Sequence, residues 1–238
     1  MKFAVISDIH GNADALEAVL KDIESKRVDV IYCTGDIVGY GPYPNQVVER
    51  IRCNEIPTVR GNYDHSVGSN TAVCGCRFED GKKEEVGVQS LIWSQGNTTS
   101  QNKKWLSMLP VQIWLELSNR KILFVHGSTR TDKEYLFEDS AALEEIAEEA
   151  NFDILICGHT HKPFHKTVKG IHFINAGSVG KPKHKPGDPR GTYVIVNVEE
   201  DSVQVSIEYV SYDYEKAAQA VIDAGLPEQL ADNLRGIL

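Results

Sequence analysis

The amino-acid sequence predicts an α/β fold, specifically a two-sheet mixed β-sandwich flanked by helices. In the N-terminal part, short apolar segments alternate with amphipathic helical patterns, which is typical of parallel strands joined by helices. Beyond residue 110, apolar and polar residues alternate around short polar turns, which is typical of antiparallel hairpins. We therefore expect one domain over residues 1–238 that contains both kinds of strand pairing.

The first sixty residues alternate between strands and helices. The expected elements are a strand at 3–7, a helix from Asn12, a strand at 28–34, a helix at 44–54 and a strand at 57–61. Asn12 is the expected N-cap of the first helix, because its side chain can accept a hydrogen bond from a backbone N–H of the first turn. That helix has one apolar face at helical spacing, formed by Leu16, Val19, Leu20 and Ile23.

The rest of the chain is less regular at first and then rich in hairpin patterns. We expect a partly helical insertion at about 66–108 over one edge of the sheet, with helical segments near 91–93 and 105–108. The later expected elements are hairpins at 111–127 and 191–210, a helical pattern within 138–150, a strand at 154–157 and C-terminal helices at about 213–236.

Composition limits the classes of function. The net charge of −9 disfavours extended nucleic-acid binding, but it leaves room for an active site that handles phosphate. No apolar run reaches the ~20 residues of a membrane span, and the N-terminal apolar run ends at Ser7, so we expect a cytoplasmic protein. Five scattered cysteines fit a reducing compartment, and we interpret Cys74 and Cys76 as two free thiols in a loop rather than a metal site or a redox pair.

Polar, metal-binding types of side chain follow five separate predicted strands. They are Asp8 and His10, then Asp36, then Asn62, then His126, and finally His159 and His161. Ligands of α/β sheets bind at the carboxyl ends of the strands, and glycines beside these residues permit tight turns and close backbone approach. Each of these short motifs alone could also be a residue of a surface turn or a hydrogen-bonded histidine of the core. The ordered set favours a metal site.

The order Asp-x-His, Gly-Asp, Gly-Asn-x-Asp, His-Gly and Gly-His-Thr-His resembles the motifs of the calcineurin-like metallophosphoesterases. The resemblance covers most of residues 1–180, and 175–193 resembles the following segment in a bacterial and archaeal branch of small phosphodiesterases. It implies one metal ion held by Asp8, His10, Asp36 and His161. It implies a second ion held by Asp36, Asn62, His126 and His159, with Asp36 as the bridge.

Ligands of these types favour divalent transition metals and hydrolytic chemistry. Carboxylate, imidazole and amide donors without thiolate suit Mn, Fe, Zn, Co or Ni, and we take manganese as the favoured ion. Two such ions about 3.5–4 Å apart can bind the attacking and leaving oxygens and ionise a bridging water. The expected function is therefore hydrolysis of phosphodiester or nucleotide pyrophosphate bonds by attack of a metal-bridging hydroxide. The alternatives are a phosphomonoesterase and a non-catalytic interaction module on the same fold.

Two departures from the family pattern narrow the expected substrate. The Gly-Asp motif continues as GDIVGYGPYP, without the phosphate-binding arginine of the phosphoprotein-phosphatase branch. Many family members have a general-acid histidine where this chain has Tyr63, and a tyrosine with a pKa of about 10 is a weaker acid near neutral pH. We predict Tyr63 and Asp64 as catalytic residues, with Asp64 able to orient an imidazole at position 63. His65 could substitute as the acid. Substrates with good leaving groups are favoured.

Substrate contacts are expected from two further places. The basic stretch contains Lys181, Lys183, Lys185 and Arg190, and its ordinary interpretation is a solvated loop. Its functional interpretation is a phosphate-contacting rim, with Arg190 as the predicted contact. Tyr40 is the predicted partner of a base or aryl group. The expected partner is a small phosphorylated or nucleotide substrate, and the sequence carries no signal for an oligomeric state.

Overall fold

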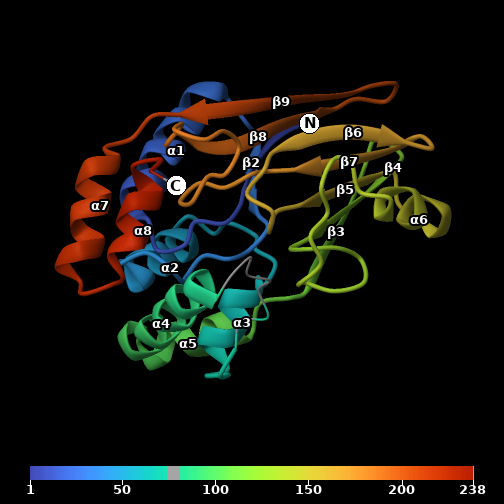
Figure 1. The fold of residues 1–238 in the computed structure, drawn as a ribbon. Helices are drawn as coiled ribbons and strands as arrows, with labels where there is room; N and C mark the ends of the chain where they lie inside the picture. The colour runs from blue at the N-terminus through green and yellow to red at the C-terminus, as the bar shows by residue number, and fades with distance from the viewer. Residues whose placement is uncertain (74, 76–80, 238) are drawn as a thin grey trace.

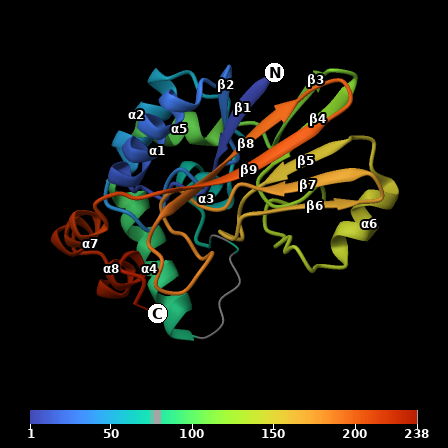
Figure 2. The same ribbon diagram turned by 90° about the horizontal axis from the view of Figure 1, so that it is seen from above.

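Two β-sheets face each other in the middle of the molecule, and helices cover their outer sides. The computed structural model describes residues 1–73, 75 and 81–237. Figure 1 and Figure 2 show α1 and α2 on the outer side of one sheet and α6 on the outer side of the other. The predicted mixed two-sheet α/β fold is confirmed. One apolar cluster lies between the two sheets, and one more lies between each sheet and the helices outside it.

The first sheet has four strands in the order β2-β1-β8-β9. Their bounds are Val30–Cys33 for β2, Lys2–Ile6 for β1, Gly191–Val198 for β8 and Val203–Val210 for β9. β1 is parallel to β2 and antiparallel to β8, so this sheet is mixed. The predicted hairpin at 191–210 is confirmed as the antiparallel pair β8 and β9.

The second sheet has five strands in the order β3-β4-β5-β7-β6. Their bounds are Gln112–Leu117, Arg120–Val125, Ile154–Cys157, Ile171–Asn175 and Phe164–Val168, in that same order. The three central strands are mutually parallel, and an antiparallel strand lies at each edge. The hairpin of β6 and β7 was not expected from the sequence, since charged and polar residues interrupt its apolar pattern.

Eight helices surround the sheets in the described part of the chain. Their bounds are Ala13–Lys26 (α1), Pro44–Cys53 (α2), Asn62–Gly68 (α3), Gly81–Asn97 (α4), Ser100–Ser107 (α5), Ala142–Glu149 (α6), Tyr214–Asp223 (α7) and Glu228–Leu234 (α8). The helical segments expected near 91–93 and 105–108 are therefore present in α4 and α5. Among the described residues, none of the helices has both the length and the apolarity that crossing a bilayer requires.

The central strands are apolar on both faces because each face is covered. In β1, Phe3 and Val5 pack in the layer between the sheets, whereas Ala4 and Ile6 pack against the helices outside. β5 shows the same division, since its alternate residues face the other sheet or α6. Burial of both faces explains why these strands are continuous apolar runs.

Asn12 fixes the start of α1 and ties it to the rest of the fold. Its side-chain oxygen accepts a hydrogen bond from the Ala15 N–H at 3.1 Å, which confirms the predicted N-cap. Its amide nitrogen donates to the Gly180 carbonyl at 3.1 Å and to the Tyr212 hydroxyl at 3.3 Å. The cap therefore also joins α1 to segments about 170 and 200 residues away in the sequence.

The strand predicted at 57–61 is wrong. The structure has only an isolated parallel bridge there, between Cys33 and Thr58, with Val59 N–H donating to the Cys33 carbonyl at 3.0 Å. Pro57 has no N–H to extend the pairing, and Gly61 already caps α3. The extended segment is therefore too short to form a ladder, although it still delivers Asn62 to the same edge of the sheet.

The cysteines of the described residues are free thiols: Cys33, Cys53 and Cys157. Cys74 and Cys76, interpreted above as thiols of a loop, lie outside the described residues.

Replacement of Asn12 tests its double role. Asn12→Ala removes the cap and both amide donations, so we expect the free energy of unfolding to fall by about 2 kcal/mol. Asp213→Ala is the matched control, because Asp213 caps α7 through the Lys216 N–H at 3.0 Å but is exposed. The control is expected to lose about 1 kcal/mol or less. Equal losses in urea titrations of the two variants would show that the bonds to Gly180 and Tyr212 add nothing.

Candidate metal centre

Seven buried polar side chains meet at one end of the two sheets. The loops after β1, β2, β4 and β5 and the start of α3 supply them. They are Asp8, His10, Asp36, Asn62, His126, His159 and His161, each at most 5% exposed. The structure thus brings together all seven side chains that the sequence placed in a metal site, and they form two adjoining groups.

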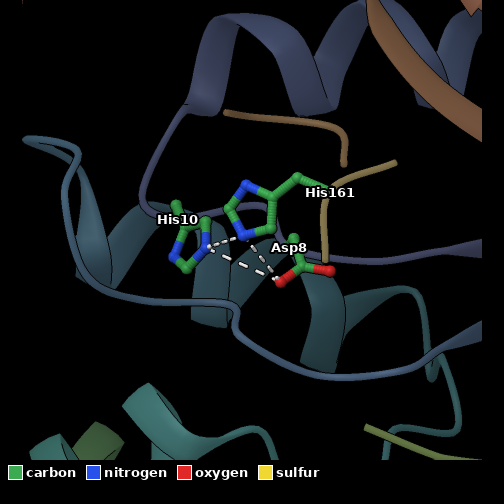
Figure 3. Close-up of side chains that lie close together, drawn as sticks. All are labelled: Asp8, His10 and His161. Atoms are coloured by element: carbon green, nitrogen blue, oxygen red, sulfur yellow. Dashed lines mark hydrogen bonds and ion pairs between the residues drawn. The ribbon is translucent and has the colours of Figure 1, made fainter. Parts of the chain in front are cut away.

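The first group consists of Asp8, His10 and His161 (Figure 3). The Nε2 atoms of the two histidines lie 3.2 Å apart. The Asp8 Oδ1 atom lies 3.2 Å from the His161 Nε2 and 3.7 Å from the His10 Nε2. Three ligand-type atoms from two distant parts of the chain thus surround one small volume.

The second group consists of Asp36, His126 and His159, with Asn62 beside it. The His126 Nε2 lies 3.1 Å from the His159 Nδ1, 3.0 Å from the Asn62 Oδ1 and 3.4 Å from the Asp36 Oδ2. A carboxylate, two imidazoles and an amide oxygen are a donor set that suits a divalent transition metal.

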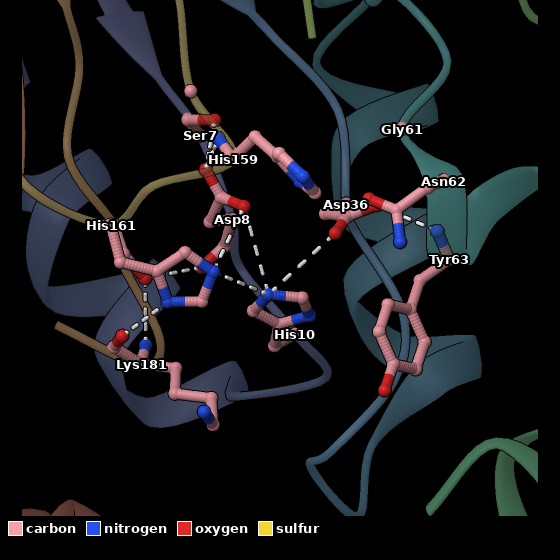
Figure 4. A network of polar contacts seen from close by, with 12 residues as sticks. Ser7, Asp8, His10, Asp36, Gly61, Asn62, Tyr63, His159, His161 and Lys181 are labelled. Carbon is pink, nitrogen blue, oxygen red and sulfur yellow. Dashed lines mark hydrogen bonds and ion pairs between the residues drawn. The ribbon is translucent and has the colours of Figure 1, made fainter. Parts of the chain in front are cut away.

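Asp36 joins the two groups. Its Oδ2 atom lies 3.4 Å from the His126 Nε2 and 3.8 Å from the His10 Nε2. Figure 4 shows Asp36 beside Asn62, with contacts running from His10 to both Asp8 and Asp36. Its other oxygen accepts the Tyr63 N–H at 2.8 Å, which fixes the plane of the carboxylate. One carboxylate oxygen therefore faces both groups.

Backbone carbonyls set the orientation of three of the imidazoles. The Nδ1 atoms of His10, His126 and His161 lie 3.1, 2.8 and 2.6 Å from the carbonyls of Val38, Thr34 and Lys181, respectively. A carbonyl accepts only, so each Nδ1 must carry the proton and donate it. In a neutral ring, each Nε2 then presents a lone pair toward the common volume, which is the arrangement of metal-ligating histidines.

The protonation of the first group fits a cation. Burial lowers the pKa of His10 well below its usual value and that of His161 to about 4, so both imidazoles are neutral near pH 7. Burial opposes the charge of Asp8, but attraction from His161, His126 and His10 holds its pKa well below the usual range. Two neutral Nε2 atoms and a carboxylate oxygen without a hydrogen-bond partner therefore face one another. A positive ion between them would satisfy all three.

In the second group, His126 carries an additional proton on the side that could bind a metal ion. Burial lowers the pKa of His126, but the Asp36 carboxylate outweighs burial and raises that pKa to about 10. Burial raises the pKa of Asp36 itself, partly against the attraction of His126. A divalent cation bound at this group would displace the proton from His126, as metal binding does at imidazole ligands.

Left-handed backbone is concentrated at this site. Five of the seven side chains are on residues with positive φ between 49° and 66°: Asp8, His10, Asp36, His159 and His161. Each such residue costs of order 1–3 kcal/mol, and such strain clusters at functional sites. Backbone hydrogen bonds between the loops offset part of the cost, including Asp8 N–H to Gly35 at 2.9 Å and His10 N–H to Asp36 at 3.0 Å.

Two glycines allow the loops to approach so closely. A Cβ atom at Gly61 would overlap the Asp36 side chain, and one at Gly158 would overlap Ser7 and Asp8. Because both residues lack a Cβ atom, the segment before α3 can lie against Asp36, and the loop after β5 can lie against Asp8. The predicted role of the glycines in close approach is thus observed at these two positions.

Asp64 holds the Asp36 loop in place. Its two oxygens accept the N–H groups of Asp36, Ile37, Val38 and Gly61 at 2.8 to 3.3 Å. Burial and the Asp36 charge raise the pKa of Asp64 to about 7, and the bonds from Gly61 and Val38 oppose that rise. Both oxygens of Asp64 are therefore engaged by the backbone of this loop, and its catalytic role stays a prediction.

Tyr63 and Tyr40 flank the first group. Their ring centroids lie 4.7 Å apart, and the His10 ring meets Tyr63 at 5.5 Å and Tyr40 at 4.9 Å, both edge-on. Tyr63 is buried, and its ring lies against Gly39. Both tyrosines line a cleft over the ligand atoms, as the predicted substrate and leaving-group contacts would need to.

One residue of the cleft, Tyr135, was not singled out by the sequence, and one predicted residue is absent from the cleft. Lys181, Lys183 and Tyr135 line the cleft, and the Tyr135 ring packs on His159 at 4.0 Å between centroids. Arg190 instead pairs with Asp188, from Nη2 to Oδ2 at 2.6 Å, and lies on the Tyr209 ring. The basic stretch therefore reaches the site through its first two lysines, and substrate contact by Arg190 stays a prediction.

The profile of the Calcineurin-like phosphoesterase superfamily domain matches residues 1–201. The chain belongs to this superfamily. It is 33% identical to an uncharacterised protein of Methanocaldococcus jannaschii, MJ0912, over 97% of this chain and 96% of that protein. It is 26% identical to the phosphodiesterase YfcE of Escherichia coli K12, over 77% of this chain and 82% of that protein. A metallophosphoesterase structure from Sphaerobacter thermophilus covers 99% of both chains with 30% identity and a TM-score of 0.79.

Membership of the superfamily agrees with the geometry. The resemblance expected from the motifs is confirmed, and the protein is a metal-dependent phosphoester hydrolase. Its two groups of carboxylate and imidazole ligands are the places where divalent metal ions can bind. No thiolate belongs to either group.

Asp64→Asn tests whether the Asp36 loop supports metal binding. The amide would set an NH₂ group against backbone N–H donors, so we expect unfolding free energy to fall by about 2–3 kcal/mol. We also expect the affinity for Mn²⁺, measured by calorimetry, to fall roughly 10- to 100-fold, as for other residues that support ligands. Asp153→Asn is the control, since Asp153 accepts one N–H, from Lys121 at 2.7 Å, at the opposite end of β4. Unchanged Mn²⁺ affinity in Asp64→Asn would contradict this role.

Proposed function

We propose that the protein is a dinuclear-metal phosphoesterase that hydrolyses phosphodiester or nucleotide pyrophosphate bonds. One observation carries the proposal, namely that a single oxygen of Asp36 faces both groups of ligands, at 3.4 Å from His126 and 3.8 Å from His10. A shared carboxylate is what a site for two neighbouring metal ions requires. YfcE, a relative whose name states an activity, is a phosphodiesterase.

The residues present would hold two divalent ions in adjoining positions. Asp8, His10 and His161 would bind one ion, and His126, His159 and Asn62 the other, with Asp36 shared between them. When bound, such ions polarise phosphoryl oxygens and lower the pKa of water to near neutrality. Ligands limited to carboxylate, imidazole and amide groups favour Mn, Fe, Zn, Co or Ni, and manganese is our proposed ion.

Side chains of this chain would position the substrate over the ligand groups. Lys181 and Lys183 line the cleft, and their ammonium groups would attract the phosphoryl oxygens of a small substrate. The Lys181 Nζ atom lies 4.4 Å from the Tyr40 ring centroid, so its charge is held at the edge of the cleft. These contacts fit a compact phosphorylated molecule rather than an extended nucleic acid, for which a net charge of −9 is unfavourable.

Tyr63 shapes the expected range of leaving groups. Its ring lies against His10 and lines the cleft, so we assign the Tyr63 hydroxyl as the general acid. A phenol is a weak acid near pH 7, and hydrolysis would depend on the intrinsic stability of the leaving group. Activated diesters and pyrophosphate-linked nucleotides meet that condition, whereas alkyl monoesters do not.

The alternative functions are less well supported. A non-catalytic interaction module does not require two complete groups of buried metal ligands. In such a module, nothing would offset the cost of the left-handed backbone at these ligands. A phosphomonoesterase would gain from a strong general acid where Tyr63 stands.

Asp36→Asn tests the dinuclear proposal. Loss of the shared charge should lower Mn²⁺-dependent turnover of bis-p-nitrophenyl phosphate roughly 100-fold or more, because a second metal contributes several kcal/mol. Bound metal should fall by at least one ion per chain, with an unchanged circular-dichroism spectrum. Asp153→Asn again serves as control. Turnover and metal content equal to those of the wild type would refute the shared role of Asp36.

Substitutions of Tyr63 test the leaving-group argument. Nitrophenolate leaves readily without a proton, so Tyr63→Phe should hydrolyse a nitrophenyl diester with little loss. Tyr63→His should accelerate alkyl esters selectively, by up to the roughly 10²–10⁴-fold of general acid catalysis. The measurement is kcat/KM against esters that span a range of leaving-group pKa. If Tyr63→Phe is equally impaired on aryl and alkyl esters, Tyr63 has a positioning role instead.

A further inference from the structure

A narrow apolar pocket lies between the two C-terminal helices and the loop that carries Tyr40. We call it the hairpin pocket. It is lined by His10, Asn12, Tyr40, Gly41, Pro42, Tyr43, Gly180, Lys181, Ala217, Val221, Leu230 and Leu234. Its volume, including the open mouth, is about 350 Å³. We refer to this enclosed space as the slot.

The hairpin pocket adjoins the metal centre. His10, Tyr40 and Lys181 line both the pocket and the cleft over the ligand groups. The His10 ring meets Tyr40 edge-on at 4.9 Å, and its Nε2 faces the Asp8 carboxylate. A molecule whose phosphoryl group lies over His10 could thus extend directly into the slot.

The far wall of the pocket is apolar. Ala217 and Val221 of α7 and Leu230 and Leu234 of α8 form it, and each is at most 7% exposed. Of the polar lining groups, the Asn12 amide already donates to Gly180 and Tyr212. A ligand group with many hydrogen-bonding atoms would lose its bonds to water here, so the pocket favours an apolar one.

α7 and α8 lie beyond the part of the chain that the superfamily profile matches, residues 1–201. They form their own apolar cluster, and Tyr40 packs against it. The Trp93 Nε1–H of α4 donates to the Ala224 carbonyl between them at 2.9 Å, and Lys216 of α7 pairs with Asp14 of α1 at 2.6 Å. The two helices thus lie outside the part that the profile matches, and Figure 1 shows them side by side at one side of the molecule.

We infer that the hairpin pocket binds an apolar, ring-sized group attached to the phosphoryl group at the metal centre. The inference rests on the proposed function and narrows its substrate class to phosphate esters with one flat apolar substituent. A pocket of this volume can hold a phenyl-sized ring, and Tyr40 and Tyr43 line it, so both side chains can contact the ring. Lys181 stands at the junction, where it can contact the phosphoryl oxygens of the same molecule.

Phosphonate inhibitors separate the pocket from the metal centre. The experiment measures the inhibition constants of phenylphosphonate and methylphosphonate against Mn²⁺-dependent hydrolysis of methyl p-nitrophenyl phosphate. Both carry the same metal-binding group, and only phenylphosphonate reaches the pocket. We expect the wild type to bind phenylphosphonate roughly tenfold or more tightly, as burial of a phenyl-sized group implies. Calorimetry on the Mn²⁺-loaded protein measures the same ratio directly and does not depend on turnover.

Variants of the pocket wall complete the test. Ala217→Phe fills the slot, so the ratio of the phenylphosphonate affinity to the methylphosphonate affinity should fall toward one. The affinity for methylphosphonate should stay the same. Gln219→Phe is the control, because Gln219 is on the same helix but exposed. If Ala217→Phe does not fold, Leu234→Ala widens the slot and should increase the affinity for naphthylphosphonate relative to phenylphosphonate.

The outcomes are distinct. A wild type with no phenyl preference, or an equal loss in Gln219→Phe, overturns the pocket inference and leaves the proposed function intact. A protein that neither hydrolyses the diester nor binds methylphosphonate with Mn²⁺ present overturns the proposed function itself. Phenyl-selective binding that Ala217→Phe abolishes supports the inference.

Discussion

The site depends on one constraint: unprotonated nitrogen and oxygen atoms of buried side chains are held facing one another. The Nε2 atoms of His10 and His161 lie 3.2 Å apart, and backbone carbonyls hold the protons of both rings on the opposite nitrogens. The nearby Asp8 Oδ1 has no hydrogen-bond partner. Such an arrangement is costly without a cation, because desolvated acceptors have lost their bonds to water. The protein therefore stores binding energy for a metal ion in the positions of its own side chains.

The fold supports this arrangement through rigid strands and strained loops. Both faces of β1 and β5 are buried, so the ends of these strands have fixed positions. The loops that follow take left-handed turns, and Asp64 offsets the cost at one of them by accepting four backbone N–H groups. A loop made of ordinary turns would point alternate side chains away from the common volume. The site thus needs both the sheet core and the clamped loops.

Much of the fold and most of the ligand set could be predicted from the sequence. Apolar periodicity gave β1, α1 and the two main hairpins, and the ordered motifs gave the seven side chains that meet in space. The prediction of a strand at 57–61 was wrong because a segment that forms a single bridge has the same apolar pattern as a short strand. Tyr135 had no distinguishing signal, since only the path of its loop brings it to the cleft. The hairpin pocket could not be foreseen either, because it depends on how α7 and α8 pack against a loop almost 200 residues earlier.

The most direct test is to locate the metals. Crystals of the protein loaded with Mn²⁺ would be measured at the manganese absorption edge, and the anomalous difference map would show each ion without reference to activity. Our account predicts two peaks about 3.5–4 Å apart, as in other two-metal sites, with a carboxylate oxygen of Asp36 between them. A single peak, or two peaks that do not share Asp36, would contradict the dinuclear centre.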